Sequence, residues 1–442
     1  MNQKTEDGFL PESEVKYLHG KPVGPPPRAT LLIKNIGQLV TMRGPAQRIG
    51  PAMQDLGLIE NAGLAVAGDE IMAIGSSEDI EGQVAVSPGC ELIDAEGSLV
   101  TPGFVDSHTH PVFHMTREKE FEFRLQGKSY MEIAESGGGI RASVRDLRSA
   151  GEEALKRELK KRLDRMLRNG ATTVEAKSGY GLSTESELLS LETVDYWNNR
   201  HPIEIIPTFL GAHEIPDEYR QNRDEYIRLL TNEMLPQVSE RKLAQFCDVF
   251  CEKGVFSIEE SRHILNTARK CGLGLKLHAD ELVSTGGAQL SVELGAISAD
   301  HLVAVSAEGI KALSASRTVA TLLPGTSYSL GMERYAPARR LIDRGGIVAL
   351  ATDCNPGSNY CESVPMIISL ACLKYRMSPA EAISAATVNG AVALGMGDKR
   401  GQLVDGRQAD VVIWDAQDYR EIPYHYGVNL VSHVVKAGKL VF

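Results

Sequence analysis

Short hydrophobic runs of the kind that form β-strands gather near both ends of the chain. Early runs such as Thr30–Asn35 and Gly63–Gly75 are separated by turn residues, and similar runs return at Ala409–Asp415 and Val431–Phe442. Two or three strands alone make a marginal sheet. We therefore expect the two chain ends to pair into one small β-sandwich domain, with residues 29–100 as its N-terminal part and residues 398–442 as its C-terminal part.

The middle of the chain alternates short apolar runs with segments of helical periodicity. After a first run at Thr101–His110 there are seven more, and amphipathic segments such as Leu155–Leu167 and Ser257–Lys270 fall between them. Short buried strands that alternate with helices form parallel sheets, and eight such units close a (β/α)8 barrel. We therefore predict an α/β protein in which residues 101–397 form a TIM-like barrel. The seven further runs are Ala171–Lys177, Glu204–Gly211, Cys247–Glu252, Gly274–Ala279, Ala299–Leu302, Val319–Pro324 and Ile347–Asp353.

Composition narrows the possible partners and the compartment. A net charge of −11 argues against nucleic acid or an anionic membrane as a general partner, since both need a basic surface. The seven cysteines are an odd number and lie in scattered segments, which is typical of reduced thiols in a cytoplasmic protein. Residues 1–28 are polar and end in Gly-Pro-Pro-Pro-Arg, so we expect a flexible tail without a signal peptide.

Histidines and an aspartate stand where the predicted strands end. In a strand, side chains two residues apart share a face, so His108 and His110 would converge on one point. His278, His301 and Asp353 come at the ends of later strands, the rim where barrels of this kind build their active sites. Each residue alone has an ordinary explanation, such as a core histidine or a turn-forming aspartate. Together they predict a site for a divalent metal ion.

Longer strings give this chain a resemblance to a known family. The chain resembles the amidohydrolase superfamily and, within it, the imidazolonepropionases of histidine degradation, from about residue 60 to its end. The strings that carry the resemblance are Arg117–Phe121, Ser136–Ile140, Lys177–Leu182, Phe209–His213, Asp248–Gly254, Lys276–Glu281 and Ala351–Ser358.

The resemblance implies a hydrolase with one divalent metal ion, Zn²⁺ or Fe²⁺. Its metal ligands would be His108, His110, His278 and Asp353. Water activated by the metal would open a cyclic amide, with Asp353 and Glu281 managing the proton and His301 stabilising the oxyanion. Glu281 also has the simpler interpretation of a solvent-facing acid at the start of a helix.

The implied substrate is 4-imidazolone-5-propanoate, and the implied product is N-formimino-L-glutamate. The substrate carboxylate calls for a planar bidentate donor, which the resemblance assigns to Arg117. Alone, Arg117 could equally be a solvated charge, and Tyr130 could be buried on a helix. The substrate contacts implied by the resemblance are Arg117, Tyr130, Tyr180, His213, Asn355, Gly357 and Ser358.

Other functions stay open at this point. A sister activity, the deamination of a cyclic amidine or nucleobase, would use much the same metal site, and a barrel that has lost its metal could serve as a scaffold. A two-metal site bridged by Lys253 is less in keeping with the pattern, and Lys177 and Cys354 fit structural roles better than catalytic ones. Residues 137–140 are better explained as a mobile loop over the site than as a phosphate cradle. The resemblance also implies a homodimer.

Overall fold

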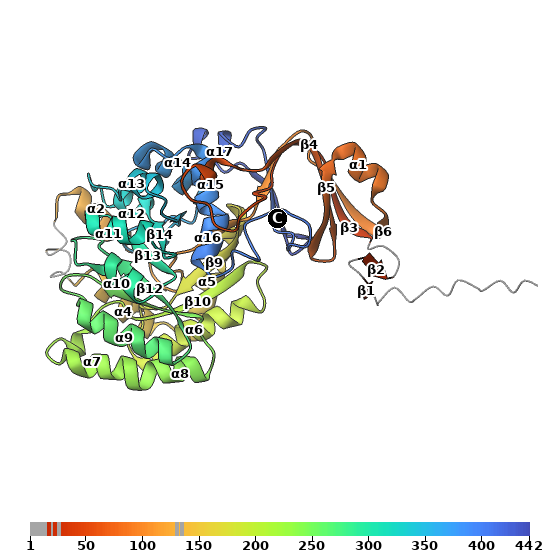
Figure 1. The fold of residues 1–442 in the computed structure, drawn as a ribbon. Coiled ribbons are helices and arrows are strands. Elements are labelled where there is room, and N and C mark those ends of the chain that lie inside the picture. Colours follow the sequence, from red (N-terminus) through yellow and green to blue (C-terminus); the bar gives the residue numbers. More distant parts are fainter. Residues whose placement is uncertain (1–15, 19–20, 24–27, 129–131, 133–136) are drawn as a thin grey trace, which may run out of the picture.

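Eight parallel strands form one of the two main sheets in the computed structural model, which describes residues 16–18, 21–23, 28–128, 132 and 137–442 (Figure 1). Each strand pairs with the next one in the chain, as the alternating pattern predicts, so the predicted barrel is confirmed. The strands are β8 (Phe104–Asp106), β9 (Ala171–Lys177), β10 (Glu204–Ala212), β11 (Phe246–Cys251), β12 (Gly274–Ala279), β13 (Ser298–His301), β14 (Val319–Leu322) and β15 (Val348–Leu350).

The first and last barrel strands meet through a short contact just beyond their ends. Residues 106–110 run beside residues 352–354, and we call this contact the seam. An isolated parallel bridge joins Thr109 to Cys354. The Asp353 N–H donates to the His108 carbonyl at 2.9 Å, and the His110 N–H donates to the Cys354 carbonyl at 2.9 Å. The seam therefore closes the barrel through the residues predicted to bind metal.

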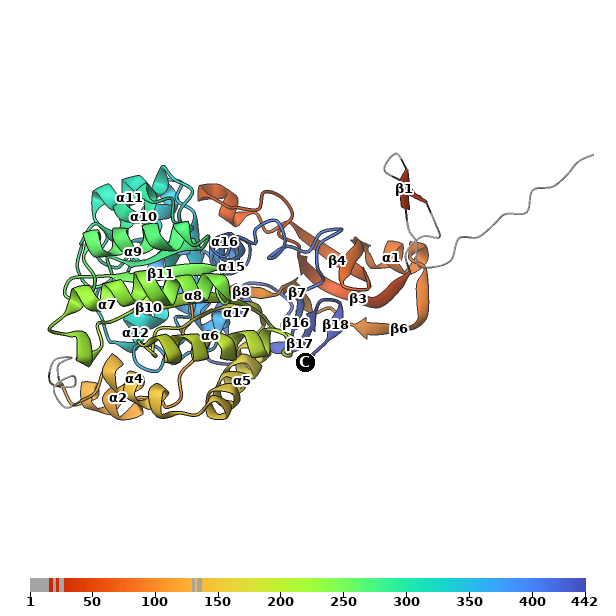
Figure 2. The same ribbon diagram turned by 90° about the horizontal axis from the view of Figure 1, so that it is seen from below.

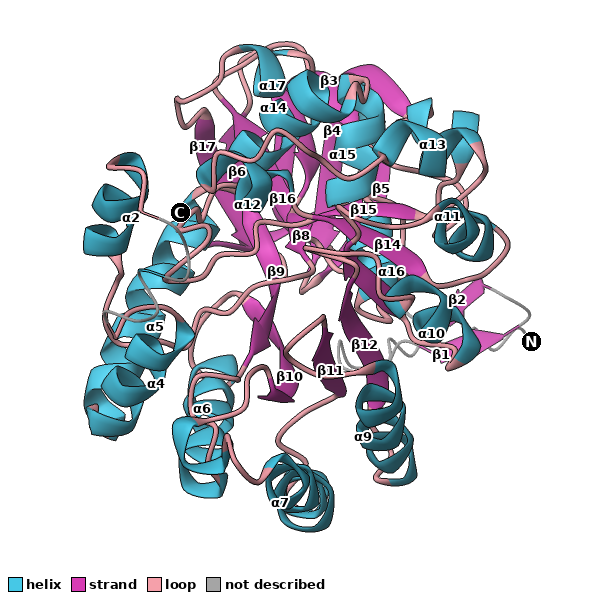
Figure 3. Ribbon diagram, turned by 90° about the vertical axis from the view of Figure 1, so that its left-hand side faces the viewer, coloured by secondary structure: helices cyan, strands magenta, loops and turns pink. Residues whose placement is uncertain are grey.

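Helices surround the strands, as Figure 3 shows for α6, α7 and α9 around β9 to β12. Both segments predicted as helices are helical. In α5 (Glu152–Arg168), Leu155, Leu159 and Leu163 are buried at four-residue intervals, and Ser257 and Glu260 form a capping box at the start of α9. The remaining barrel-side helices are α2 (Glu118–Leu125), α4 (Ile140–Ser149), α6 (Thr184–Asn198), α7 (Arg223–Leu229), α8 (Leu235–Glu240), α9 (Ile258–Lys270), α10 (Gly287–Glu293), α11 (Ala307–Ser314), α12 (Pro324–Ser329), α13 (Ala338–Asp343), α14 (Val364–Tyr375), α15 (Pro379–Ala386), α16 (Val388–Ala393) and α17 (Glu421–Tyr424).

The second sheet combines both ends of the chain, as expected, and lies beside the barrel (Figure 2). Its strand order is β18-β17-β16-β7-β3-β4-β5, with β6 also pairing with β3. The pairing is mixed, because β6 and β7 run parallel to β3. The helix α1 (Ser77–Gln83) follows β5. The strands are β3 (Ala29–Val40), β4 (Leu58–Ala67), β5 (Glu70–Ser76), β6 (Val86–Asp94), β7 (Leu99–Pro102), β16 (Val411–Trp414), β17 (Val431–Lys436) and β18 (Lys439–Leu440).

The run that begins at Thr101 is shared between the two sheets. Its start belongs to β7 in the small sheet, its next part forms β8 in the barrel, and Gly103 lies between them. A Cβ atom on Gly103 would lie 2.1 Å from Thr172 Oγ1, so only glycine fits this junction. The small sheet therefore reaches slightly past the expected boundary at residue 100.

The expected tail is described only in part. Within residues 1–28 the structure describes Arg28 and a short antiparallel pair, β1 (Lys16–Leu18) and β2 (Lys21–Val23). None of the helices in the described ranges is long and apolar enough to cross a membrane.

Candidate metal and active site

Four side chains from the first, fifth and last barrel strands converge at the C-terminal rim. His110 Nε2 lies 3.2 Å from His108 Nε2 and 3.3 Å from His278 Nε2. Asp353 Oδ1 lies 3.4 Å from His110 Nε2 and 3.6 Å from His108 Nε2. Ligand atoms about 2.0–2.1 Å from a tetrahedral metal ion lie about 3.3 Å from one another. These spacings suit one divalent metal ion.

The carboxylates that face two of the histidines also favour a cation. His108 Nδ1 faces Asp300 Oδ2 at 2.7 Å, and His278 Nδ1 faces Asp248 Oδ2 at 2.9 Å. When Nδ1 carries the proton, Nε2 keeps its lone pair, so two lone pairs point toward His110 Nε2. One N–H on His110 could satisfy only one of them. A metal ion would accept the Nε2 lone pairs of His108, His110 and His278 together. The residues therefore fit the divalent metal ion that the sequence pattern predicts.

Burial sets the charge of these ligands. It lowers the pKa of His108 and His110 well below the usual range and keeps both imidazoles neutral. Burial also raises the pKa of Asp353 to about 6. For His278, burial lowers the pKa, but the charge and hydrogen bonding of Asp248, together with the charge of Asp300, raise the pKa overall.

A buried ionic network lies directly behind the histidines. Lys177 Nζ lies 2.7 Å from Asp248, 2.9 Å from Glu175 and 3.8 Å from Asp300. Lys276 Nζ also lies 2.9 Å from Glu175. The sequence favours a structural role for Lys177, but the two aspartates that face the histidines were not predicted. The sequence does contain a signal for these two aspartates. A buried aspartate in a short apolar strand is costly unless it has a polar partner, so each one predicts such a partner nearby.

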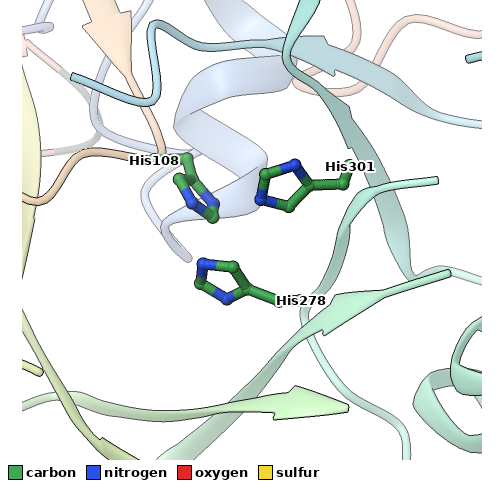
Figure 4. Close-up of side chains that lie close together, drawn as sticks. All are labelled: His108, His278 and His301. Carbon is green, nitrogen blue, oxygen red and sulfur yellow. The ribbon is translucent and has the colours of Figure 1, made fainter. Parts of the chain in front are cut away.

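Glu281 and His301 stand beside the ligands. Glu281 Oε1 lies 3.5 Å from His301 Nδ1, and His301 Nε2 is buried without a hydrogen-bond partner among the described residues. Figure 4 shows the rings of His108, His278 and His301 close together. Burial, and then the charge of Asp353, raise the pKa of Glu281 to about 8. A carboxyl group with such a pKa can hold and release a proton near neutral pH.

Arg117 carries unfilled donors beside the loop that follows Asp353. Its Nε lies 3.6 Å from Glu120, beyond hydrogen-bonding distance, and its buried Nε and Nη1 have no acceptor among the described residues. A Cβ atom on Gly357 would lie 1.1 Å from Arg117 Nη2, so the guanidinium packs directly on this glycine. Both residues line a cavity of about 570 Å³ together with Arg124, Phe121, Tyr328 and Met366.

Tyr180 and His213 form an aromatic wall next to His110. The ring of His213 stacks on His110 with centroids 5.1 Å apart, and Tyr180 lies 5.2 Å from His213. His213 Nδ1 lies 2.9 Å from the Gly179 carbonyl, which leaves Nε2 as an acceptor. Burial lowers the pKa of His213 to about 3, so its ring is neutral. Burial raises the pKa of Tyr180 well above its usual range, and the positive charge of Arg117 offsets only part of this rise.

The loop after the last strand is organised by Asn355. Its Oδ1 accepts the N–H groups of Gly357 and Ser358 at 2.8 Å, and its Nδ2 donates to the Asp353 carbonyl at 2.7 Å and to Ser358 Oγ at 2.8 Å. Its amide is thus used within the loop, and it sets Gly357 against Arg117.

Tyr130 and Ser136 are outside the described residues, while Gly139 beyond them donates its N–H to Glu120 at 2.8 Å. Lys253 is exposed, and Cys354 is buried in the seam.

Comparison with known proteins places this site in a family. The sequence model of the amidohydrolase family matches residues 99–441. The chain is 49% identical to the imidazolonepropionase of Clostridium tetani over 94% of this chain and 99% of that protein. It is 48% identical to the imidazolonepropionase of Geobacillus kaustophilus over 93% and 97%.

Solved structures show the same fold at low identity. A zinc-bound adenosine deaminase from Xanthomonas campestris aligns with a TM-score of 0.67 at 19% identity, over 94% of this chain and 93% of that one. A variant atrazine chlorohydrolase from Arthrobacter aurescens, complexed with zinc and atraton, aligns with a TM-score of 0.67 at 17% identity, over 93% and 94%. The chain therefore belongs to the amidohydrolase family and, within it, to the imidazolonepropionases.

Proposed function

We propose that this protein hydrolyses the ring of 4-imidazolone-5-propanoate to N-formimino-L-glutamate in histidine degradation. The observation that carries the proposal is the guanidinium of Arg117, whose unfilled donors lie against Gly357 in the loop that follows Asp353, one of the residues of the histidine and carboxylate cluster. A substrate with a reactive ring at one end and a carboxylate at the other would meet both. A neutral nucleobase would leave the arginine unpaired, which favours ring opening over deamination.

His108, His110, His278 and Asp353 would hold one divalent metal ion, Zn²⁺ or Fe²⁺. Bound there, such an ion supplies Lewis acidity, which lowers the pKa of water toward neutrality and polarises a carbonyl group. Asp300 and Asp248 hold the first and third of these imidazoles in the tautomer that leaves Nε2 free.

The remaining steps belong to side chains of this protein. Water attacks the ring carbonyl carbon, and Glu281, assisted by Asp353, takes the proton that the water loses. The carbon–nitrogen bond then breaks, and Glu281 returns this proton to the departing ring nitrogen. His301 lies beside Glu281 and hydrogen-bonds to the oxyanion that forms.

Other side chains orient the substrate. Arg117 binds the carboxylate through two parallel N–H groups, while Tyr180 and His213 contact the ring. Ser358 contacts the tail, and Asn355 and Gly357 shape the loop around it. Tyr130 stays a predicted contact. The proposal also includes that the protein is a homodimer and acts in the cytoplasm.

The direct test supplies imidazolone propanoate, generated in place by a urocanate hydratase, to the fully metallated protein. We expect its absorbance to decay with formation of N-formimino-L-glutamate, and no release of ammonia in this step. An absence of turnover would disprove the proposal, while ammonia release from a cyclic amidine in its place would support a deaminase.

A further inference from the structure

The loop that carries Glu281 has exposed side chains directly after that residue. Leu282 and Val283, which follow Glu281, are 57% and 41% exposed, and Ser284 is exposed too. A segment with few buried apolar contacts keeps its place mainly through backbone hydrogen bonds. The position of Glu281 therefore depends on what the backbone of this loop binds.

Glu252 is the group that this backbone binds. It follows β11 directly, and its side chain is almost completely buried. Its Oε2 accepts the N–H groups of Leu282 at 2.8 Å and Val283 at 3.4 Å, and its Oε1 accepts the N–H of Lys253 at 2.8 Å. A buried carboxylate is costly unless its oxygens are hydrogen-bonded. The loop N–H groups therefore stabilise the buried carboxylate of Glu252, and this carboxylate in turn fixes the loop backbone.

The far end of the loop has a different anchor. Asp280 Oδ1 accepts the N–H groups of Thr285 at 2.7 Å and Gly286 at 3.0 Å, and Oδ2 accepts that of Ala288 at 3.0 Å. These bonds fix the start of α10, several residues beyond Glu281. Glu252 instead holds the peptide N–H that immediately follows Glu281.

We propose that Glu252 is a positioning residue for Glu281. By holding the N–H groups of Leu282 and Val283, it keeps the Glu281 carboxylate beside His301, where the two side chains are 3.5 Å apart. The inference rests on the proposed function of Glu281 in proton transfer, but the contact itself can be measured without any turnover.

The first test is hydrogen exchange on the metallated protein. In Glu252→Ala, the amides of Leu282 and Val283 lose their acceptor, and we expect their exchange to accelerate by at least about tenfold. Glu252→Gln keeps one accepting oxygen, so a smaller acceleration is expected, and it serves if the alanine variant does not fold. Glu259→Gln removes an exposed acid in the first turn of the neighbouring helix α9 and should change nothing.

The second test is kinetic. A small displacement of a catalytic group costs up to about a hundredfold in rate, so Glu252→Ala should lower kcat by about tenfold to a hundredfold. KM and metal content should stay close to the parent values. In the Glu281→Gln background the same change should have little further effect, because residues that act through one another are not additive.

Unchanged exchange at Leu282 and Val283 would overturn the proposal, and so would an equal loss of kcat with and without Glu281. If the parent protein itself fails to turn over imidazolone propanoate, the proposed function falls. The exchange measurement would then still decide whether Glu252 holds the loop.

Discussion

At the scale of single residues, the site depends on imidazoles whose orientation is fixed by neighbouring carboxylates. Asp300 and Asp248 each face the Nδ1 of one histidine, and Lys177 contacts both carboxylates. A carboxylate behind a metal-binding histidine fixes its tautomer and raises its basicity. The strength of metal binding should therefore depend on residues that do not touch the metal.

Asp300→Asn tests this dependence. The change keeps the size of the side chain but removes the charge that faces His108, and we expect metal affinity to fall about tenfold to a hundredfold. Competition with a chromogenic chelator measures the dissociation constant. Asp224→Asn, at an exposed position in α7, is the control. Equal affinity in the two variants would contradict the role given to Asp300.

Arg117 and Glu281 should separate binding from chemistry. Arg117→Ala removes charge-assisted hydrogen bonds of about 1.5–3 kcal/mol, so KM should rise about tenfold to a hundredfold with a smaller change in kcat. Glu281→Gln should instead lower kcat by about 10² to 10⁴ and leave KM near its parent value. Steady-state kinetics on imidazolone propanoate, with exposed Arg228→Ala as control, distinguishes these outcomes. An unchanged KM in Arg117→Ala would rule out the carboxylate anchor.

At the scale of elements, the strands were predictable and the contacts between loops were not. The period of apolar runs predicts β9 and β12 with the bounds that the structure gives. It does not reveal that the run starting at Thr101 divides at Gly103 between two sheets, because that division depends on Thr172, which lies far along the chain.

The candidate site divides in the same way. Strand ends predicted that His108, His110, His278, His301 and Asp353 would lie at one rim, because parallel strands end there. The choice of four of these residues as metal ligands came from the resemblance. The roles of Asp300 and Glu252 depend on tertiary hydrogen bonds that no local pattern records.

Gly357→Ala is the prediction for the loop after β15. A Cβ atom there would occupy the place of Arg117 Nη2. The guanidinium must therefore move, and its N–H groups no longer point toward the substrate carboxylate. We expect KM to rise as in Arg117→Ala, with metal content unchanged and little additional effect in the double variant. Gly82→Ala, where a Cβ atom would meet open space, should leave KM as it is. Full additivity of Gly357→Ala and Arg117→Ala would show that the glycine acts elsewhere.

At the scale of the whole molecule, one hydrophobic cluster joins the barrel to the small sheet, which also has a second cluster of its own. Val40 and Leu99 from the N-terminal part, and Trp414 and Val434 from the C-terminal part, belong to the same buried cluster as the barrel residues. Trp414 Nε1 also donates to Thr101 Oγ1 at 2.9 Å. Parts that share a core lose their packing together, so we expect them to unfold together.

The two tryptophans allow this to be measured. Trp197 lies on α6 beside the barrel and Trp414 on β16 in the small sheet. In urea, the fluorescence midpoint of Trp197→Phe, which reports on the sheet, should coincide with its circular dichroism midpoint. The same should hold for Trp414→Phe, which reports on the barrel. A sheet transition at lower urea than the helical signal would mean that the sheet unfolds independently.

Because the seam joins the first and last barrel strands, it determines when the metal site can form during synthesis of the chain. Three of the four predicted metal ligands emerge from the ribosome long before the strand that precedes Asp353, which is the last of the barrel. An unfinished chain can therefore offer histidines to a metal but cannot close the barrel around it. Stable uptake of the ion would then come last, and it would mark a chain whose two barrel ends have already met.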